Sequence, residues 1–235
     1  RTISSSYGTN GELLTMSAMG VTELTCVYDE HGNLLSATDS TGNTQDYGYD
    51  NTGNLTSVTD SLGPLMNMTY DEDGHVTSIT NAEGQITNFS YDAEGRLTSR
   101  TVTYQGTTLT DTYSYDAANR VTGITYANGN TVSYTYNQAG DVVSSTDSQG
   151  RTVTYTYDLY GNLTGIAYPD GTSETFTYDL EGRNLTATDR MGRTATFTYD
   201  AVGNVLSKTY ANGATEEFSY DVCDRLVSST HVNGG

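Results

Sequence analysis

The strongest constraint on the fold is a period of 21 residues that runs along the chain. A tyrosine recurs at this spacing, except for one interval of 24 residues between Tyr91 and Tyr115. Asp follows the tyrosine in nine copies, Asn137 follows it in the tenth, and an eroded eleventh copy begins at Tyr7. A fixed period indicates that each copy is one structural unit stacked on its neighbours. We therefore predict a single array of about eleven repeats over residues 1–235, the first degenerate and the last truncated, within a longer protein.

Three positions define the repeat: a tyrosine, the Asp after it, and a residue four places after the tyrosine that is usually glycine. Their members are Tyr28, Asp29, Gly32, Tyr49, Asp50, Gly53, Tyr70, Asp71, Gly74, Tyr91, Asp92, Gly95, Tyr115, Asp116, Tyr136, Gly140, Tyr157, Asp158, Gly161, Tyr178, Asp179, Gly182, Tyr199, Asp200, Gly203, Tyr220 and Asp221. At the glycine position Asn119 and Asp224 are the exceptions, and Asn and Asp are the other residues that best tolerate positive φ. The pattern is typical of a type I turn that closes a hairpin through a glycine bulge. We interpret these residues as structural.

A second glycine, such as Gly171, lies ten residues after the first and marks a second turn. Two turns leave two strands of about six residues in each copy. An aromatic residue stands two places before the repeat tyrosine in eight of ten copies, as Phe176 does before Tyr178, with a small or β-branched residue such as Thr177 between them. This alternation predicts one aromatic face and one threonine-like face.

The pairing within a hairpin follows from the same alternation. We expect Leu55, Ser57 and Thr59 to share a face, so that the tyrosine pairs with the aliphatic residue and the second aromatic covers the small one. With an odd period, the aromatic face stays on one side only if one loop is odd and the other even, or if a strand carries a bulge. Both solutions remain open. We also expect a bulge at Asn184, which replaces an aliphatic residue, and a longer loop in 102–112, which holds three extra residues.

The number of strands predicts the architecture. Roughly 22 strands make a strip, and open twisted sheets seldom exceed ~10 strands without curling. We predict an all-β fold in which tandem 21-residue β-hairpin repeats form a long antiparallel sheet that curls into a tube or a hollow-shell wall. Such a sheet tolerates low hydrophobicity because each repeat contacts mainly its neighbours. Unpaired strands at the sheet edges predict association with neighbouring copies.

Charge and cysteine content exclude several classes of partner. The formal net charge is −19 and Lys208 is the only lysine, so we predict no nucleic-acid binding. No apolar run approaches the ~18 residues of a membrane span, so we predict no membrane insertion. Cys26 and Cys223 lie near opposite ends of the array, which predicts that they are unpaired.

Catalytic and metal-binding patterns are weak. His31, His75 and His231 fall in different repeats, and no serine or cysteine has a partner at a recognisable spacing, so we predict no enzyme activity and no cofactor. Equivalent Asp residues should lie about 10 Å apart, whereas calcium ligands must come within ~2.6 Å of the ion, which favours turn capping over metal binding. Rows of tyrosine could stack on sugars, although cross-strand packing is the favoured interpretation.

The motif Tyr-Asp-x-x-Gly-Arg/Asn-Leu, at 91–97 and 49–55, closely resembles the YD repeat, also called the RHS repeat. The resemblance extends over nearly the whole chain. The family includes bacterial Rhs polymorphic toxins, the cocoon component of insecticidal toxin complexes, and animal teneurins. The resemblance implies a hollow shell, which in the bacterial members encloses a toxic C-terminal domain.

We therefore predict a non-catalytic shell or scaffold segment of a secreted or cell-surface YD-repeat protein, which we expect to be bacterial. Its expected partner is the C-terminal cargo domain of its own parent protein. The sequence shows neither the aspartic-protease-like segment that closes bacterial shells nor a non-repetitive C-terminal domain. The alternative is an extended adhesion or carbohydrate-binding module, with glycans as its ligands.

Overall fold

The computed structural model describes residues 3–233, and the chain divides into two compact units. The first comprises Arg1–Ser114 with Thr125–Gly129, and the second comprises Tyr115–Ile124 with Asn130–Gly235. All the regular secondary structure in residues 3–233 is β-strand, as predicted. The two units are described separately below.

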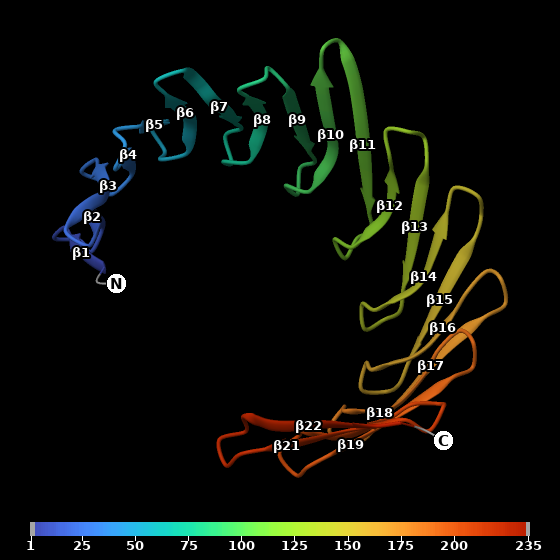
Figure 1. Cartoon of the computed structure of the whole chain (residues 1–235). Helices are drawn as coiled ribbons and strands as arrows, with labels where there is room; N and C mark the ends of the chain where they lie inside the picture. The colour runs from blue at the N-terminus through green and yellow to red at the C-terminus, as the bar shows by residue number, and fades with distance from the viewer. Residues whose placement is uncertain (1–2, 234–235) are drawn as a thin grey trace. The chain divides into compact units, whose positions relative to one another are not determined.

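The strands are short and follow one another in chain order within each unit (Figure 1). The earlier strands are β1 (Ile3–Tyr7), β2 (Leu13–Ala18), β3 (Val21–Tyr28), β4 (Leu34–Asp39), β5 (Thr44–Tyr49), β6 (Leu55–Asp60), β7 (Gly63–Tyr70), β8 (Val76–Asn81), β9 (Ile86–Tyr91), β10 (Leu97–Tyr104) and β11 (Thr107–Tyr115). The later strands are β12 (Val121–Thr125), β13 (Thr131–Tyr136), β14 (Val142–Asp147), β15 (Thr152–Tyr157), β16 (Leu163–Ala167), β17 (Ser173–Tyr178), β18 (Asn184–Thr188), β19 (Thr194–Tyr199), β20 (Val205–Thr209), β21 (Thr215–Tyr220) and β22 (Leu226–Val232).

Within each unit, neighbouring strands pair antiparallel. Successive pairings join β1 through to β11, and further successive pairings join β13 through to β22. The strand residues are mainly threonine, aromatic and β-branched residues, which favour extended backbone. The predicted meander of tandem hairpins is thus confirmed within each unit.

Both turns of a standard repeat follow one plan. In the first turn of one copy, the Asp50 N–H donates to the Asn54 carbonyl at 2.9 Å, and the Gly53 N–H donates to the Asp50 carbonyl at 3.1 Å. The second turn at Asp147–Arg151 has the same two bonds, at 3.1 and 2.9 Å. Each turn therefore encloses a three-residue loop, so both loops are odd.

A bulge solves the problem of the odd period. Tyr157 pairs with Leu163, but the preceding Thr156 pairs with Gly165, so Thr164 has no partner across the hairpin. The same shift occurs beside the repeat tyrosine in the other standard hairpins. One bulge per copy reverses the side-chain alternation once, which is what a period of 21 requires. The bulge, rather than a mixture of odd and even loops, is the solution in the standard copies.

This bulge corrects one predicted pairing. The tyrosine does pair with the aliphatic residue, as Tyr49 does with Leu55. The second aromatic, Tyr47, pairs with Val58 instead of covering Ser57, so the prediction that Leu55, Ser57 and Thr59 share a face is wrong. The bulge moves the alternation by one residue, and the aliphatic side chain shares the aromatic face with the residue three places after it.

The segment 102–112 corrects a second expectation. The three extra residues do not lengthen a loop, because Tyr104 pairs with Thr107 across a two-residue turn and the extra residues extend β10 and β11. Gln105 and Gly106 have φ of 49° and 80°, as a type I′ turn requires, and this turn matches the twist of the flanking strands. An even loop changes the alternation once more, which suits an even period of 24.

Asn184 occupies the ordinary place of the aliphatic residue. It pairs with Tyr178, and the bulge beside it is the one that the standard copies share, so Asn184 adds no irregularity of its own. Leu185 lies one place later and is 38 % exposed, on the other side of the strand. The Asn184 Oδ1 atom is buried without a hydrogen-bond partner.

Packing within each unit is confined to one layer. Among the described hydrophobic side chains, only Cys26, Val58 and Ala214 are buried. The strands of each unit pack against their neighbours in the sheet. The apolar layer is therefore the half-buried aromatic face itself, and stability depends on bonds between neighbouring repeats.

Candidate functional site

The repeat tyrosines join each copy to the one before it. Their hydroxyl groups donate to the backbone carbonyl of the residue 15 places earlier, at 2.5–3.0 Å. The donors with such a bond are Tyr49, Tyr70, Tyr91, Tyr136, Tyr157, Tyr178 and Tyr199. Burial raises the pKa of Tyr49 and of Tyr157. These hydroxyls form a row along the aromatic face that supports packing rather than exposed ligand binding.

The repeat Asp residues cap their own turns. In all nine copies the carboxylate accepts the backbone N–H of the residue four places later, and the nine are Asp29, Asp50, Asp71, Asp92, Asp116, Asp158, Asp179, Asp200 and Asp221. Asn137 accepts the equivalent N–H in the tenth copy. The hydroxyl of Thr52 and the N–H of Asn54 lower the pKa of Asp50 to about 2. The carboxylates are already used by the turn, and no group of three or more metal-ligating side chains gathers among the described residues.

The glycine position has left-handed backbone, as predicted. Gly161 has φ of 85°, and the exceptions Asn119 and Asp224 have φ of 63° and 57°. Positive φ is also found at Gly32, Gly53, Gly74, Gly95, Gly140, Gly182 and Gly203. The glycines therefore serve the backbone of the turn.

The residue five places after the tyrosine links two turns, a role that the sequence analysis did not identify. The Arg183 Nε atom donates to the Asp179 carboxylate at 2.6 Å, and its Nη1 atom donates to the Asp200 carbonyl of the next copy at 3.1 Å. The guanidinium also lies 5.1 Å from the ring centroid of Tyr199. Such a contact combines a charged hydrogen bond with a cation–π interaction. The recurrence of Arg or Asn at this position was the available signal.

His75 lies five places after its repeat tyrosine, as Arg183 does, and makes similar contacts. The His75 Nδ1 atom lies 3.0 Å from the Asp71 carboxylate, and its ring stacks on Tyr91 with centroids 4.8 Å apart. His231 lies 3.8 Å from Glu216 in a different repeat. The three histidines thus occupy separate repeats, and the described residues do not assemble them around a common centre.

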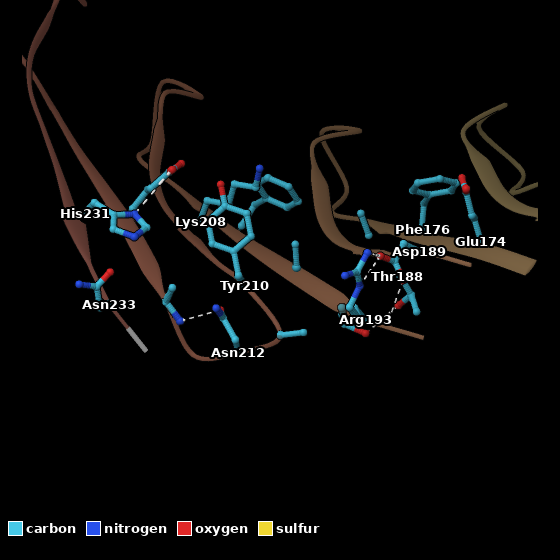
Figure 2. A pocket seen from close by; sticks show the side chains of 17 residues that line it. Glu174, Phe176, Thr188, Asp189, Arg193, Lys208, Tyr210, Asn212, His231 and Asn233 are labelled. Carbon is cyan, nitrogen blue, oxygen red and sulfur yellow. Dashed lines mark hydrogen bonds and ion pairs between the residues drawn. The ribbon is translucent and has the colours of Figure 1, made fainter. Parts of the chain in front are cut away.

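An open hollow of about 820 Å³ lies on the aromatic face over β17 to β22 (Figure 2). Its floor contains Ala187 and Ala195, which pair with each other across β18 and β19. Phe176 and Phe197 line the hollow, and the Lys208 ammonium lies 4.5 Å from the ring centroid of Tyr210. Figure 2 shows Phe176 and Lys208 toward different ends, with Asp189 and Arg193 between them. The hollow offers aromatic surface beside charged groups.

Small side chains create such hollows. Ala187 stands where other copies have larger residues, such as Ile166 opposite Tyr155. A second hollow, of about 420 Å³, is lined by Ser145, which holds the same place opposite Tyr134. Sequence reasoning missed both hollows because it assigned this position to the wrong face.

The two cysteines are free thiols, Cys26 buried and Cys223 exposed. Residues 3–233 include no helix long and apolar enough to cross a membrane.

Comparison with known proteins identifies the repeat and the fold. The family model described as Teneurin YD-shell matches residues 49–179, and the RHS repeat model matches 28–64, 178–215 and 199–235. No curated protein has a significant match to the chain. The matched region of the YD-shell model covers more than half of the chain.

Solved structures share the fold at low sequence identity. A crystal structure of TcdB2-TccC3-Cdc42 matches 97 % of the chain with a TM-score of 0.78 and 16 % identity. TcdB2-TccC3 without its hypervariable C-terminal region matches 94 % with a TM-score of 0.76 and 17 % identity. A Photorhabdus luminescens Tc holotoxin pore matches 98 % with a TM-score of 0.73 and 14 % identity. The chain spans 14 %, 13 % and 16 % of those chains respectively. The predicted fold class is confirmed.

Proposed function

The chain belongs to the Teneurin YD-shell family, and we propose that it is a wall segment of a hollow shell in a longer secreted or cell-surface protein, where it encloses a C-terminal cargo domain. The family and the likeness to the TcdB2-TccC3 structures establish the coarser part, a structural shell segment. Enclosure, the cargo and the location outside the cell are the proposed part. One of the similar structures is TcdB2-TccC3 without its hypervariable C-terminal region, and a variable region at that end supports a variable cargo.

One observation carries the proposal: each unit is a single layer whose neighbouring copies are bonded together. The Tyr178 hydroxyl donates to the Leu163 carbonyl at 2.9 Å, and the Arg183 guanidinium reaches the next copy. Only three described hydrophobic side chains are buried. A wall needs continuity along its length more than a thick core, and these inter-repeat bonds supply it.

A non-catalytic role fits the chemistry of the same residues. The repeat carboxylates accept backbone N–H groups within their own turns, and the tyrosine hydroxyls donate to carbonyls of the preceding copy. These groups are committed to holding the sheet together. We propose that the segment acts mechanically, and that any chemistry of the parent protein resides elsewhere in it.

Protease protection of the parent protein tests enclosure. We expect the region C-terminal to the repeats to resist proteolysis in the intact parent and to become sensitive when the wall is weakened by Tyr157→Phe together with Tyr178→Phe. Tyr160→Phe is the matched control, because Tyr160 lies exposed at a turn tip. A C-terminal region that is digested equally in all three proteins would contradict enclosure.

Carbohydrate binding is the second candidate, and the aromatic hollow over β17 to β22 favours it. Sugars stack on accessible aromatic rings and form hydrogen bonds with charged groups beside them, and the half-buried rings of Phe176 and Phe197 line this hollow. Replacing Ala187 with Ile would fill the floor with the residue that β16 carries at the same place. Glycan-array binding that is lost in Ala187→Ile would support adhesion, and an array without any bound glycan would reject it.

A further inference from the structure

The first turns of four successive repeats in the second unit end in exposed apolar side chains. The exposed fractions are 102 % for Leu159, 78 % for Tyr160, 86 % for Leu180, 72 % for Val202 and 101 % for Val222. We call these five residues the apolar rim. They lie at the tips of turns that the sheet spaces two strands apart, about 9.6 Å. Single exposed apolar side chains are common on soluble proteins, whereas apolar side chains gathered along one edge can form an interaction surface.

The turns do not need apolar tips. Closure depends on the backbone bonds of the repeat Asp and glycine and on the Asp carboxylate, as at Asp158 and Gly161. The same tip positions in several copies of the first unit hold polar pairs, such as Asn51 with Thr52 and Glu72 with Asp73. An identical turn plan therefore forms with polar tips, and folding does not explain the apolar rim.

We propose that the apolar rim is a docking edge for a second copy of the chain, with turn tips meeting turn tips. The spacing suits this occupant, because a second copy presents the same turns at the same interval and can engage all four at once. A two-fold axis across the rim would give both copies the same contacts. Roughly 100 Å² of apolar area per side chain gives on the order of 1,000 Å² in total, at the low end of specific interfaces. The association should be reversible.

The charges around the rim give this association a signature. Six carboxylates stand at or beside the four turns, from Asp158, Asp179, Glu181, Asp200, Asp221 and Asp224, against the guanidinium groups of Arg183 and Arg225. Two such rims repel each other through water, and added salt screens that repulsion. Association at the rim should therefore strengthen as ionic strength rises. Binding to a basic partner would weaken instead.

Sedimentation of the chain over a range of concentration and salt tests the proposal. The test variant carries Leu159→Asn, Tyr160→Thr, Leu180→Asn, Val202→Thr and Val222→Asn. Each substitution introduces the residue type that Asn51 or Thr52 provides at the same tip position in the first unit. The control is Met191→Gln, which removes a 76 % exposed apolar residue from a second turn. We expect the natural chain and the control to dimerise more tightly in high salt, and the rim variant to lose at least tenfold in affinity.

Cys223 supplies a second readout, because it lies in one of the four turns of the apolar rim. Its thiol is exposed beside Val222, whereas Cys26 is buried. We expect alkylation of Cys223 by iodoacetamide to slow severalfold with rising concentration in the natural chain and to stay constant in the rim variant. A natural chain that remains monomeric at high salt would overturn the proposal. Equal association of the rim variant, equal Cys223 reactivity at all concentrations, or association that weakens with salt would also overturn it.

Discussion

The two units carry the same repeat but close their second turns differently. In the first unit two-residue turns at Met19–Gly20, Ser61–Leu62 and Gln105–Gly106 occur among three-residue turns. From β13 onward, the three-residue plan is found in the second turns at Asp147–Arg151, Tyr168–Thr172, Asp189–Arg193 and Tyr210–Ala214. The difference shows that loop length is free to vary, provided that the aromatic side chains return to the same face.

Bulges balance the change in loop length. Around Met19–Gly20 and Ser61–Leu62 a second bulge accompanies the two-residue turn, and the period stays at 21. Around Gln105–Gly106 the hairpin has no second bulge, and the period is 24. Each even loop and each bulge reverses the alternation once, so an odd period needs an odd number of reversals. A two-residue turn therefore keeps the aromatic side chains on one face of the sheet either with a second bulge or with a period of 24.

Deleting the bulged residue should have the largest effect, because it breaks this rule. Leu206 lies between Val205, which pairs with Tyr199, and Ser207, which pairs with Thr198. Its deletion would turn Phe218 and Tyr220 to the threonine face, so we expect proteolysis to remove the chain beyond β20. Leu206→Thr is the control, because it keeps the residue count. Equal digestion patterns for the two variants would show that the bulge does not set the face.

Replacing a turn glycine by a β-branched residue should rank second. Gly161→Val places such a residue at φ of 85°, which costs about 2 kcal/mol and lowers Tm by roughly 4–8 °C. Asn119→Gly relieves a φ of 63° and should leave Tm unchanged or slightly raised. Thermal melts measure both. Equal Tm values would remove the basis for the turn assignment.

Removing one tyrosine hydroxyl should have a smaller effect, and an equal one in the two units. Tyr70→Phe loses a 2.7 Å bond to the Leu55 carbonyl, and Tyr157→Phe loses a 2.8 Å bond to the Val142 carbonyl. A partly buried hydrogen bond of this kind contributes about 1 kcal/mol, or roughly 2–4 °C in Tm. Melts of the two variants compare the units directly. A loss confined to one unit would show that the row of hydroxyls acts in that unit alone.

Acid should produce the smallest effect per group, because the repeat Asp carboxylates remain partly open to solvent. The Thr52 hydroxyl holds the pKa of Asp50 at about 2, below its unfolded value of about 3.9. A carboxyl group whose pKa is lower in the folded state stabilises the fold. This contribution is fully present above about pH 4 and is lost as the pH falls toward 2. We expect Tm of the natural chain to fall across this window, and Asp50→Asn to reduce the fall. Asn137 shows that an amide can accept the same N–H. A Tm that is constant from pH 5 to pH 2 would contradict this role.

Local features of the fold were predictable from residue types. Asn119 and Asp224 in place of glycine indicated positive φ, and both have it. The Asp residues indicated turn capping, and the carboxylates make those bonds. These features depend on contacts within about five residues, where residue type directly selects backbone geometry.

Contacts between copies were harder to predict from the sequence. A bulge was one of two solutions that the sequence left open, but threonine suits either face of a strand, so residue type did not place the bulge at Thr56 and Thr164. Without that position, Ser57 rather than Val58 was assigned to the aromatic face. The bulge expected at Asn184 is the same bulge that every standard copy carries, so Asn184 did not mark a special irregularity. The hollow over Ala187 and Ala195 depends on that corrected assignment.

The residues by themselves determined the period, the two turns of each copy, the aromatic and threonine faces and the family resemblance, because each follows from spacing and local backbone preference. Only the tertiary structure decided where the register shifts, that Tyr157 reaches the Val142 carbonyl, and that Arg183 reaches the next turn. Those contacts join atoms 15 and 17 residues apart along the chain, and strand pairing is what brings them within hydrogen-bonding distance.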